Sequence, residues 1–102
     1  MNNLPKDELR QQLNLETGKL TWHELQRYFA RGVVVEVSSE LDLVKVAEKF
    51  VLDDKKTIQA WMNNNFVTRA TDETALQWNT TQPTFWAIVA APWVLVQPIN
   101  LQ

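Results

Sequence analysis

The sequence predicts a single α+β domain with about five helices and a small, mainly antiparallel sheet. The chain has 102 residues, near the commonest domain size, and 45% of them are hydrophobic and 22% charged, as in ordinary globular proteins. Stretches with helical spacing of apolar residues are interspersed with short runs rich in β-branched residues. No repeat or linker divides the chain, so we expect one domain over residues 1–102, with an N-terminal helix at 1–18 and a core over 21–97.

The first helix is expected near the N-terminus, where Leu9 and Leu13 lie four residues apart on one helical face. Asn3 fits its N-terminal cap, and Gly18 is a natural stop. This helix precedes the better-defined core of the domain.

The second helix has the clearest start, because Thr21 and Glu24 have the spacing of a capping box. Gly32 stands where a left-handed residue ends a helix, and the β-branched run at 33–37 then predicts a strand. The apolar residues of this helix repeat at helical spacing: Trp22, Leu25 and Phe29.

A third and a fourth helix follow, joined by a short turn. We expect Ser38-Ser39 to cap the third helix and either Asp53 or Asp54 to cap the fourth. Asn63-Asn64-Asn65 ends the fourth helix, since asparagine tolerates the left-handed conformation. A short strand is predicted at 66–69.

Thr71 is expected to cap a last helix. The run 85–97 is apolar on both alternating faces, so a strand there must be covered on both sides. Pro92 predicts a bulge, bend or edge, because proline cannot donate to a sheet ladder. The run fits either one bent strand or two.

From Thr21 onward, the element order also resembles a winged helix-turn-helix, with an extra helix in the wing. A generic α+β arrangement explains the same order of helices and strands. The sequence leaves both architectures open.

Composition excludes several catalytic chemistries. The absence of cysteine removes disulfides, thiolate metal sites and cysteine nucleophiles. The single histidine, His23, reads as a surface residue of the second helix, and the two glycines read as helix stops rather than a phosphate loop. Adjacent acids such as Asp53 and Asp54 read as helix caps. We therefore expect no enzyme activity, no metal and no cofactor.

A basic and polar face is predicted on the fourth helix and the strand after it. In a winged helix-turn-helix such a face enters the major groove, where Gln and Asn read adenine and lysines contact phosphates. A solvated helix face is the competing interpretation, and the net charge of −2 argues against indiscriminate nucleic-acid binding. The candidate nucleic-acid-binding residues are Lys55, Lys56, Gln59, Asn63 and Arg69.

Five tryptophans are more than most small domains carry, and packing in the core explains most of them. Tryptophan also anchors protein interfaces. Trp93 is the candidate interface residue, together with Pro92, which places it near an edge or bend.

The sequence resembles an uncharacterised family of small bacterial proteins, a domain of unknown function. The resemblance rests on the stretches at 13–17, 22–30 and 41–47, on Trp61, and above all on the closing Ala91-Pro92-Trp93-Val94-Leu95-Val96-Gln97. It covers nearly the whole chain and implies a bacterial, stand-alone domain. It implies no activity and no site residues.

We expect a non-enzymatic interaction or regulatory protein that acts through self-association or a protein partner. The alternative is a winged-helix nucleic-acid-binding protein. The N-terminus does not read as a secretion signal, and the longest apolar stretch is too short to span a membrane as a helix, which needs about 20 residues. A cytoplasmic location without membrane contact is therefore expected.

Overall fold

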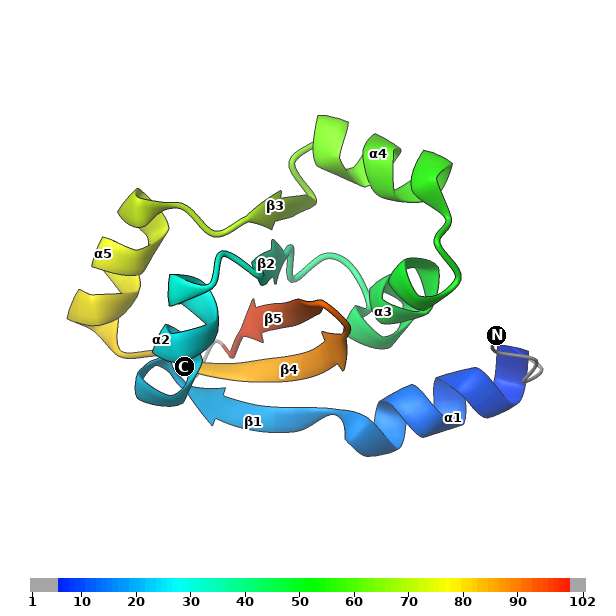
Figure 1. Ribbon diagram of the computed structural model, residues 1–102, viewed down its shortest axis with the longest axis horizontal. Coiled ribbons are helices and arrows are strands. Elements are labelled where there is room, and N and C mark those ends of the chain that lie inside the picture. The colour runs from blue at the N-terminus through cyan, green and yellow to red at the C-terminus, as the bar shows by residue number, and fades with distance from the viewer. Residues whose placement is uncertain (1–5, 100–102) are drawn as a thin grey trace.

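The computed structural model describes residues 6–99. The cap expected at Asn3 lies outside the described residues. The elements are, in chain order, α1 (Lys6–Glu16), β1 (Gly18–Thr21), α2 (Trp22–Ala30), β2 (Val34–Val37), α3 (Leu43–Val51), α4 (Lys55–Asn63), β3 (Val67–Arg69), α5 (Asp72–Thr81), β4 (Thr84–Ala90) and β5 (Trp93–Pro98) (Figure 1).

The strands form one sheet in the order β1-β4-β5-β2-β3. Strands β2 and β5 run parallel, and the other three neighbouring pairs are antiparallel. The prediction of an α+β fold with five helices and a mainly antiparallel sheet is therefore confirmed.

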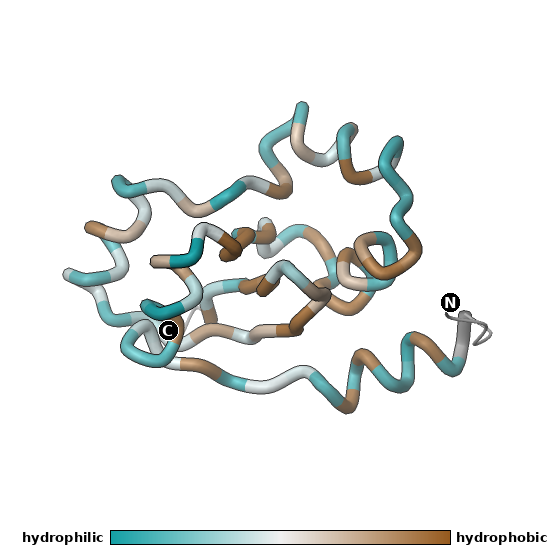
Figure 2. The backbone as a smooth tube through the Cα atoms, in the orientation of Figure 1, coloured by the Kyte–Doolittle hydropathy of each residue, from teal (hydrophilic) through white to brown (hydrophobic). Residues whose placement is uncertain are grey.

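The sheet is covered by helices on both faces (Figure 1). On one face, Leu9 and Leu13 of α1 and Val46 of α3 pack against the strands. On the other face, Leu25 of α2 and Trp78 of α5 do the same. The apolar backbone positions accordingly concentrate in β2, β4, β5 and α3, in the middle of the molecule (Figure 2).

The apolar run near the C-terminus forms two strands rather than one bent strand. Strands β4 and β5 make a hairpin in which Ala90 pairs with Trp93, so that Ala91 and Pro92 form the turn. The peptide bond before Pro92 is cis. Both strands lie inside the sheet between β1 and β2, so the chain itself supplies the cover that this apolar run requires.

The winged helix-turn-helix is not the arrangement that forms. In that fold the three helices pack together on one side of the sheet. Here Leu25 of α2 and Val46 of α3 belong to separate cores on opposite faces. Trp22 of α2 instead packs against Trp78 of α5, with ring centroids 5.5 Å apart.

Most of the predicted helix ends are found where the sequence places them. The Thr21 capping box is formed, Asp54 caps α4 and Thr71 caps α5. Asn65 ends the α4 segment in the left-handed region with φ 61°. The prediction that Ser38-Ser39 caps α3 is wrong. The cap is Asp42, whose carboxylate accepts hydrogen bonds from the Val44 and Lys45 N–H groups.

A second difference concerns Gly18, which opens strand β1 and does not directly end a helix. Helix α1 already ends at Glu16. Strand β1 has no apolar alternation of its own and pairs with β4 through the register Lys19↔Trp86. The Lys19 ammonium lies 5.0 Å from the centroid of the Trp86 ring, and Trp86 is 40% exposed and lies outside the core.

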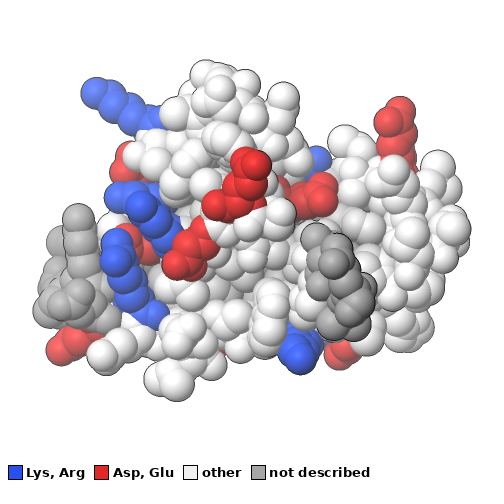
Figure 3. Space-filling model, turned by 180° about the vertical axis from the view of Figure 1, so that it is seen from behind, with Lys and Arg blue, Asp and Glu red and all other residues white. Residues whose placement is uncertain are grey.

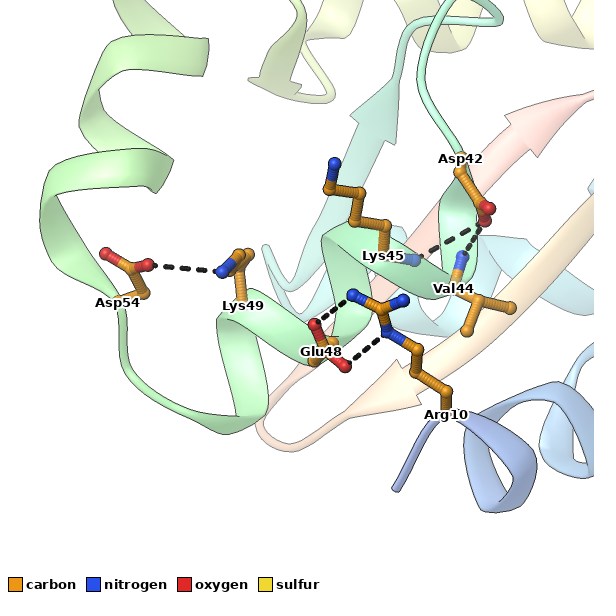
Figure 4. A network of polar contacts seen from close by, with 7 residues as sticks. All are labelled: Arg10, Asp42, Val44, Lys45, Glu48, Lys49 and Asp54. Carbon is orange, nitrogen blue, oxygen red and sulfur yellow. Dashed lines mark hydrogen bonds and ion pairs between the residues drawn. The ribbon is translucent and has the colours of Figure 1, made fainter. Parts of the chain in front are cut away.

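Two ion pairs fix the helices on the face of α3 (Figure 4). Arg10 of α1 donates through Nε and Nη2 to the fully buried Glu48 of α3, at 2.7 and 3.2 Å. Lys49 of α3 lies 3.6 Å from Asp54, the residue that caps α4. The residue that caps α4 therefore also contacts α3. Hydrogen bonds from Thr57 lower the pKa of Asp54.

Candidate functional site

The described residues do not assemble a candidate metal centre. Within residues 6–99, no three His, Asp or Glu side chains converge closely enough to hold a metal ion. His23 is exposed on α2, as expected from its position in the sequence. The described part of the chain also has no helix that is long and apolar enough to cross a membrane.

The structure brings four of the five candidate nucleic-acid-binding residues together. Lys55, Lys56, Gln59 and Asn63 line a shallow hollow on the outer face of α4. The Gln59 amide donates to the Asn63 side-chain oxygen at 3.0 Å, and the Lys55 ammonium lies 3.9 Å from Asp53. Both amides are therefore paired with each other, and one lysine is close to an acid.

The charges of the molecule are interspersed in the view from behind. Figure 3 shows Lys and Arg side chains gathered toward one side of this face, with Asp and Glu side chains next to them and across the centre. Such a mixture gives a weaker attraction for a phosphate backbone than a continuous basic surface does.

Arg69 is the residue that departs from the predicted basic face. Its Nη2 donates to the Gly32 carbonyl at 2.7 Å, and its guanidinium lies 5.6 Å from the centroid of the Trp93 ring. Gly32 has φ +74°, and a Cβ there would lie 3.1 Å from the Arg69 nitrogen. A glycine thus serves both the left-handed turn and the close approach of this arginine.

A small apolar hollow of about 180 Å³ opens beside this stacked pair. Helices α3 and α4 and strands β2, β3 and β5 all contribute residues to its wall. Its lining residues are Val35, Phe50, Ile58, Met62, Val67, Arg69 and Trp93. We call this cavity the Trp93 hollow.

The Trp93 hollow combines residues that the sequence assigns to different roles. Trp93 is the predicted interface residue, whereas Arg69 is predicted to contact nucleic acid. Pro92, the other predicted interface residue, is exposed in the hairpin turn and does not line the hollow. The sequence did not single out Phe50, Ile58 and Met62 as site residues.

The size of the Trp93 hollow limits what it can hold. Pockets that enclose a drug-sized ligand have volumes of about 300–1,000 Å³. A hollow of about 180 Å³ is closer to the volume of one large apolar side chain. Its wall is apolar except for Arg69, whose exposed guanidinium supplies a positive charge.

Comparison with known proteins identifies the family of the chain. The sequence model of a family described as "Protein of unknown function (DUF2288)" matches residues 8–98. The chain belongs to this family. The DUF2288 match confirms the resemblance to a family of unknown function and covers both cores of the sheet.

A solved structure supports the fold of this DUF2288 chain. The NMR solution structure of PA1075 from Pseudomonas aeruginosa is 35% identical, with a TM-score of 0.79, over 100% of this chain and 97% of that chain. The comparison with curated proteins found no similar sequence. The matches therefore establish family and fold and assign no activity.

Proposed function

We propose that this protein is a non-enzymatic interaction module of the bacterial cytoplasm. It binds a protein partner by taking up one large apolar side chain in the Trp93 hollow. The observation that carries the proposal is the hollow itself: an apolar cavity of about 180 Å³ between α4 and the sheet, with an exposed arginine in its wall.

The energetics of such a contact favour a short partner segment. Burial of one Leu or Phe side chain contributes about 1.5–3 kcal/mol. Tryptophan and arginine are also enriched among the residues that dominate binding energy at protein interfaces. Arg69 complements an acidic residue next to the apolar anchor, and Lys55 and Lys56 on the outer face of α4 add positive charge nearby.

A partner other than a second copy of the chain is favoured. An apolar C-terminal run left uncovered would favour self-association, but its two strands are covered by neighbouring strands and by helices of the same chain. Nucleic-acid binding remains the alternative. It rests on four residues of α4, of which Gln59 and Asn63 are hydrogen-bonded to each other.

The test is an NMR titration in which the ¹⁵N-labelled protein receives increasing amounts of the peptide acetyl-Asp-Phe-Asp-amide and its chemical shifts are followed. We expect saturable binding with a Kd of about 1 mM, with shifts concentrated at the Trp93 indole and at Arg69. Replacement of the peptide's Phe by Ala is expected to abolish the shifts. The corresponding peptide that carries Lys in place of both Asp residues is expected to bind more weakly.

Two variants of the protein locate the contact. Met62→Trp enlarges a 40% exposed side chain that lines the hollow and is expected to abolish peptide binding. Leu76→Trp makes a comparable change at a 70% exposed position of α5 and is expected to leave it unchanged. Unaltered binding by the Met62→Trp variant would overturn the proposed site.

A further inference from the structure

A second hollow, of about 270 Å³, lies at the end of strands β2 and β3 and is distinct from the Trp93 hollow. Polar and apolar residues both line it. Five polar side chains contribute to it: Glu36, Ser38, Ser39, Asn65 and Thr68. We call it the Glu36 hollow.

The fold directs Glu36 toward one face of the sheet. Glu36 pairs with Thr68 of β3 on one side and with Val96 of β5 on the other. Because side chains alternate along a strand, Glu36 shares its face with Val34, which belongs to the core under α2 and α5.

Glu36 is an unusual residue for this position. It interrupts the valine-rich strand Val34–Val37 and is half-buried. Burial raises the pKa of its carboxyl group, and within residues 6–99 no hydrogen bond or ion pair to that carboxylate is present. A half-buried carboxylate without a counterion is less stable in its charged form, so a positively charged partner would stabilise it.

The neighbouring groups favour an organic cation over a metal ion. The residues that line the hollow contain a single carboxylate, whereas hard metal ions usually take several oxygen ligands of which more than one is charged. Ser39, Asn65 and Thr68 offer neutral oxygens that accept hydrogen bonds. An ammonium group has three donors, which matches one carboxylate and two neutral acceptors.

We propose that the Glu36 hollow binds a small molecule that carries a primary ammonium group, with the Glu36 carboxylate as its counterion. The volume of about 270 Å³ lies just below that of ordinary ligand pockets, which fits a ligand of a few heavy atoms. This site is independent of the proposed protein contact, because the two hollows have no lining residue in common.

The experiment titrates the protein with n-butylammonium and follows the Glu36 side-chain carboxyl carbon and the backbone amides by NMR. n-Butanol serves as the neutral probe and butyrate as the anionic probe. We expect saturable shifts at Glu36, Asn65 and Thr68 with n-butylammonium alone. Equal shifts with n-butanol would overturn the proposal, as would shifts confined to other acidic residues.

Glu36→Gln keeps the shape of the side chain and removes its charge. We expect it to weaken n-butylammonium binding about tenfold or more. Glu40→Gln changes an exposed glutamate of the neighbouring loop and serves as the control that keeps the affinity. Equal affinity of the Glu36→Gln variant and the unaltered protein would contradict the assignment.

A titration on the unaltered protein tests the same point without a variant. Glu36 is the titratable side chain among the residues that line the hollow. Bound n-butylammonium is expected to lower the apparent pKa of Glu36, because a cation favours the ionised form. An unchanged Glu36 titration at saturating n-butylammonium would overturn the proposal.

Discussion

At the scale of single residues, the two half-buried or buried glutamates of the chain illustrate opposite solutions. Glu48 is fully buried in α3 and accepts two hydrogen bonds from Arg10. Glu36 is half-buried in β2 and has no partner within residues 6–99. Glu48 thus holds α1 against α3, whereas Glu36 marks a candidate binding site.

Arg10→Ala tests the contribution of the first contact. Removal of the guanidinium leaves the buried Glu48 carboxylate with fewer hydrogen bonds, so we expect the free energy of unfolding to fall by about 1–3 kcal/mol. Urea denaturation measures this change. Arg31→Ala, an exposed position at the end of α2, is the control and is expected to stay within about 0.5 kcal/mol.

Glu36→Gln also has a pH-dependent effect on stability. Because burial raises the pKa of Glu36 in the folded protein, its protonated form stabilises the fold at low pH, and this stabilisation is lost as the pH rises through that pKa. The variant stays neutral, so we expect its Tm to exceed that of the unaltered protein at about pH 8 and the difference to shrink toward about pH 4. A difference that is constant with pH would contradict the effect of burial.

At the scale of elements, local signals predicted most helix ends because caps depend on residues close in sequence. Thr21, Asp54 and Thr71 cap as expected. Strand β1 was missed because its four residues, GKLT, carry no alternation, and its pairing partner β4 lies more than 60 residues away. The error at Ser38-Ser39 arose because several residues before α3 have side chains suited to capping.

The cap of α3 gives a direct test. Asp42→Ala removes the acceptor of two N–H groups, so we expect a loss of about 1 kcal/mol in the free energy of unfolding. Ser39→Ala is the matched control, and we expect a change of no more than about 0.5 kcal/mol. Chemical denaturation of the two variants compares them. A larger loss for Ser39→Ala would restore the cap predicted from the sequence.

At the scale of the whole molecule, the arrangement of the sheet decides the candidate sites. Element order was compatible with a winged helix-turn-helix, yet order alone does not say which face of a sheet a helix covers. Here α2 and α3 cover opposite faces. The pairing of β5 with β2, and of β2 with β3, then brings Trp93 and Arg69 together from separate parts of the chain.

The candidate sites were therefore predictable in parts. Trp93 was identified from its place beside Pro92, but its stacking on Arg69 depends on long-range strand pairing. Glu36 is visible in the sequence as a carboxylate within a run of valines. The hollow beside it is formed by strand ends and loops that are far apart in the sequence, so residue spacing does not predict it. The residue types that line the hollows are visible in the sequence, whereas the way they come together depends on the pairing of distant strands.

The Trp93 hollow is the central claim, and one measurement tests it most directly. The chain has two methionines, Met1 and Met62, so ¹³C-methyl labelling of methionine gives a simple spectrum in which Met62 reports on the hollow. With saturating acetyl-Asp-Phe-Asp-amide, we predict intermolecular nuclear Overhauser effects between the peptide's phenyl protons and the Met62 methyl group. Bound peptide whose phenyl ring gives no such effect to Met62 would contradict the account.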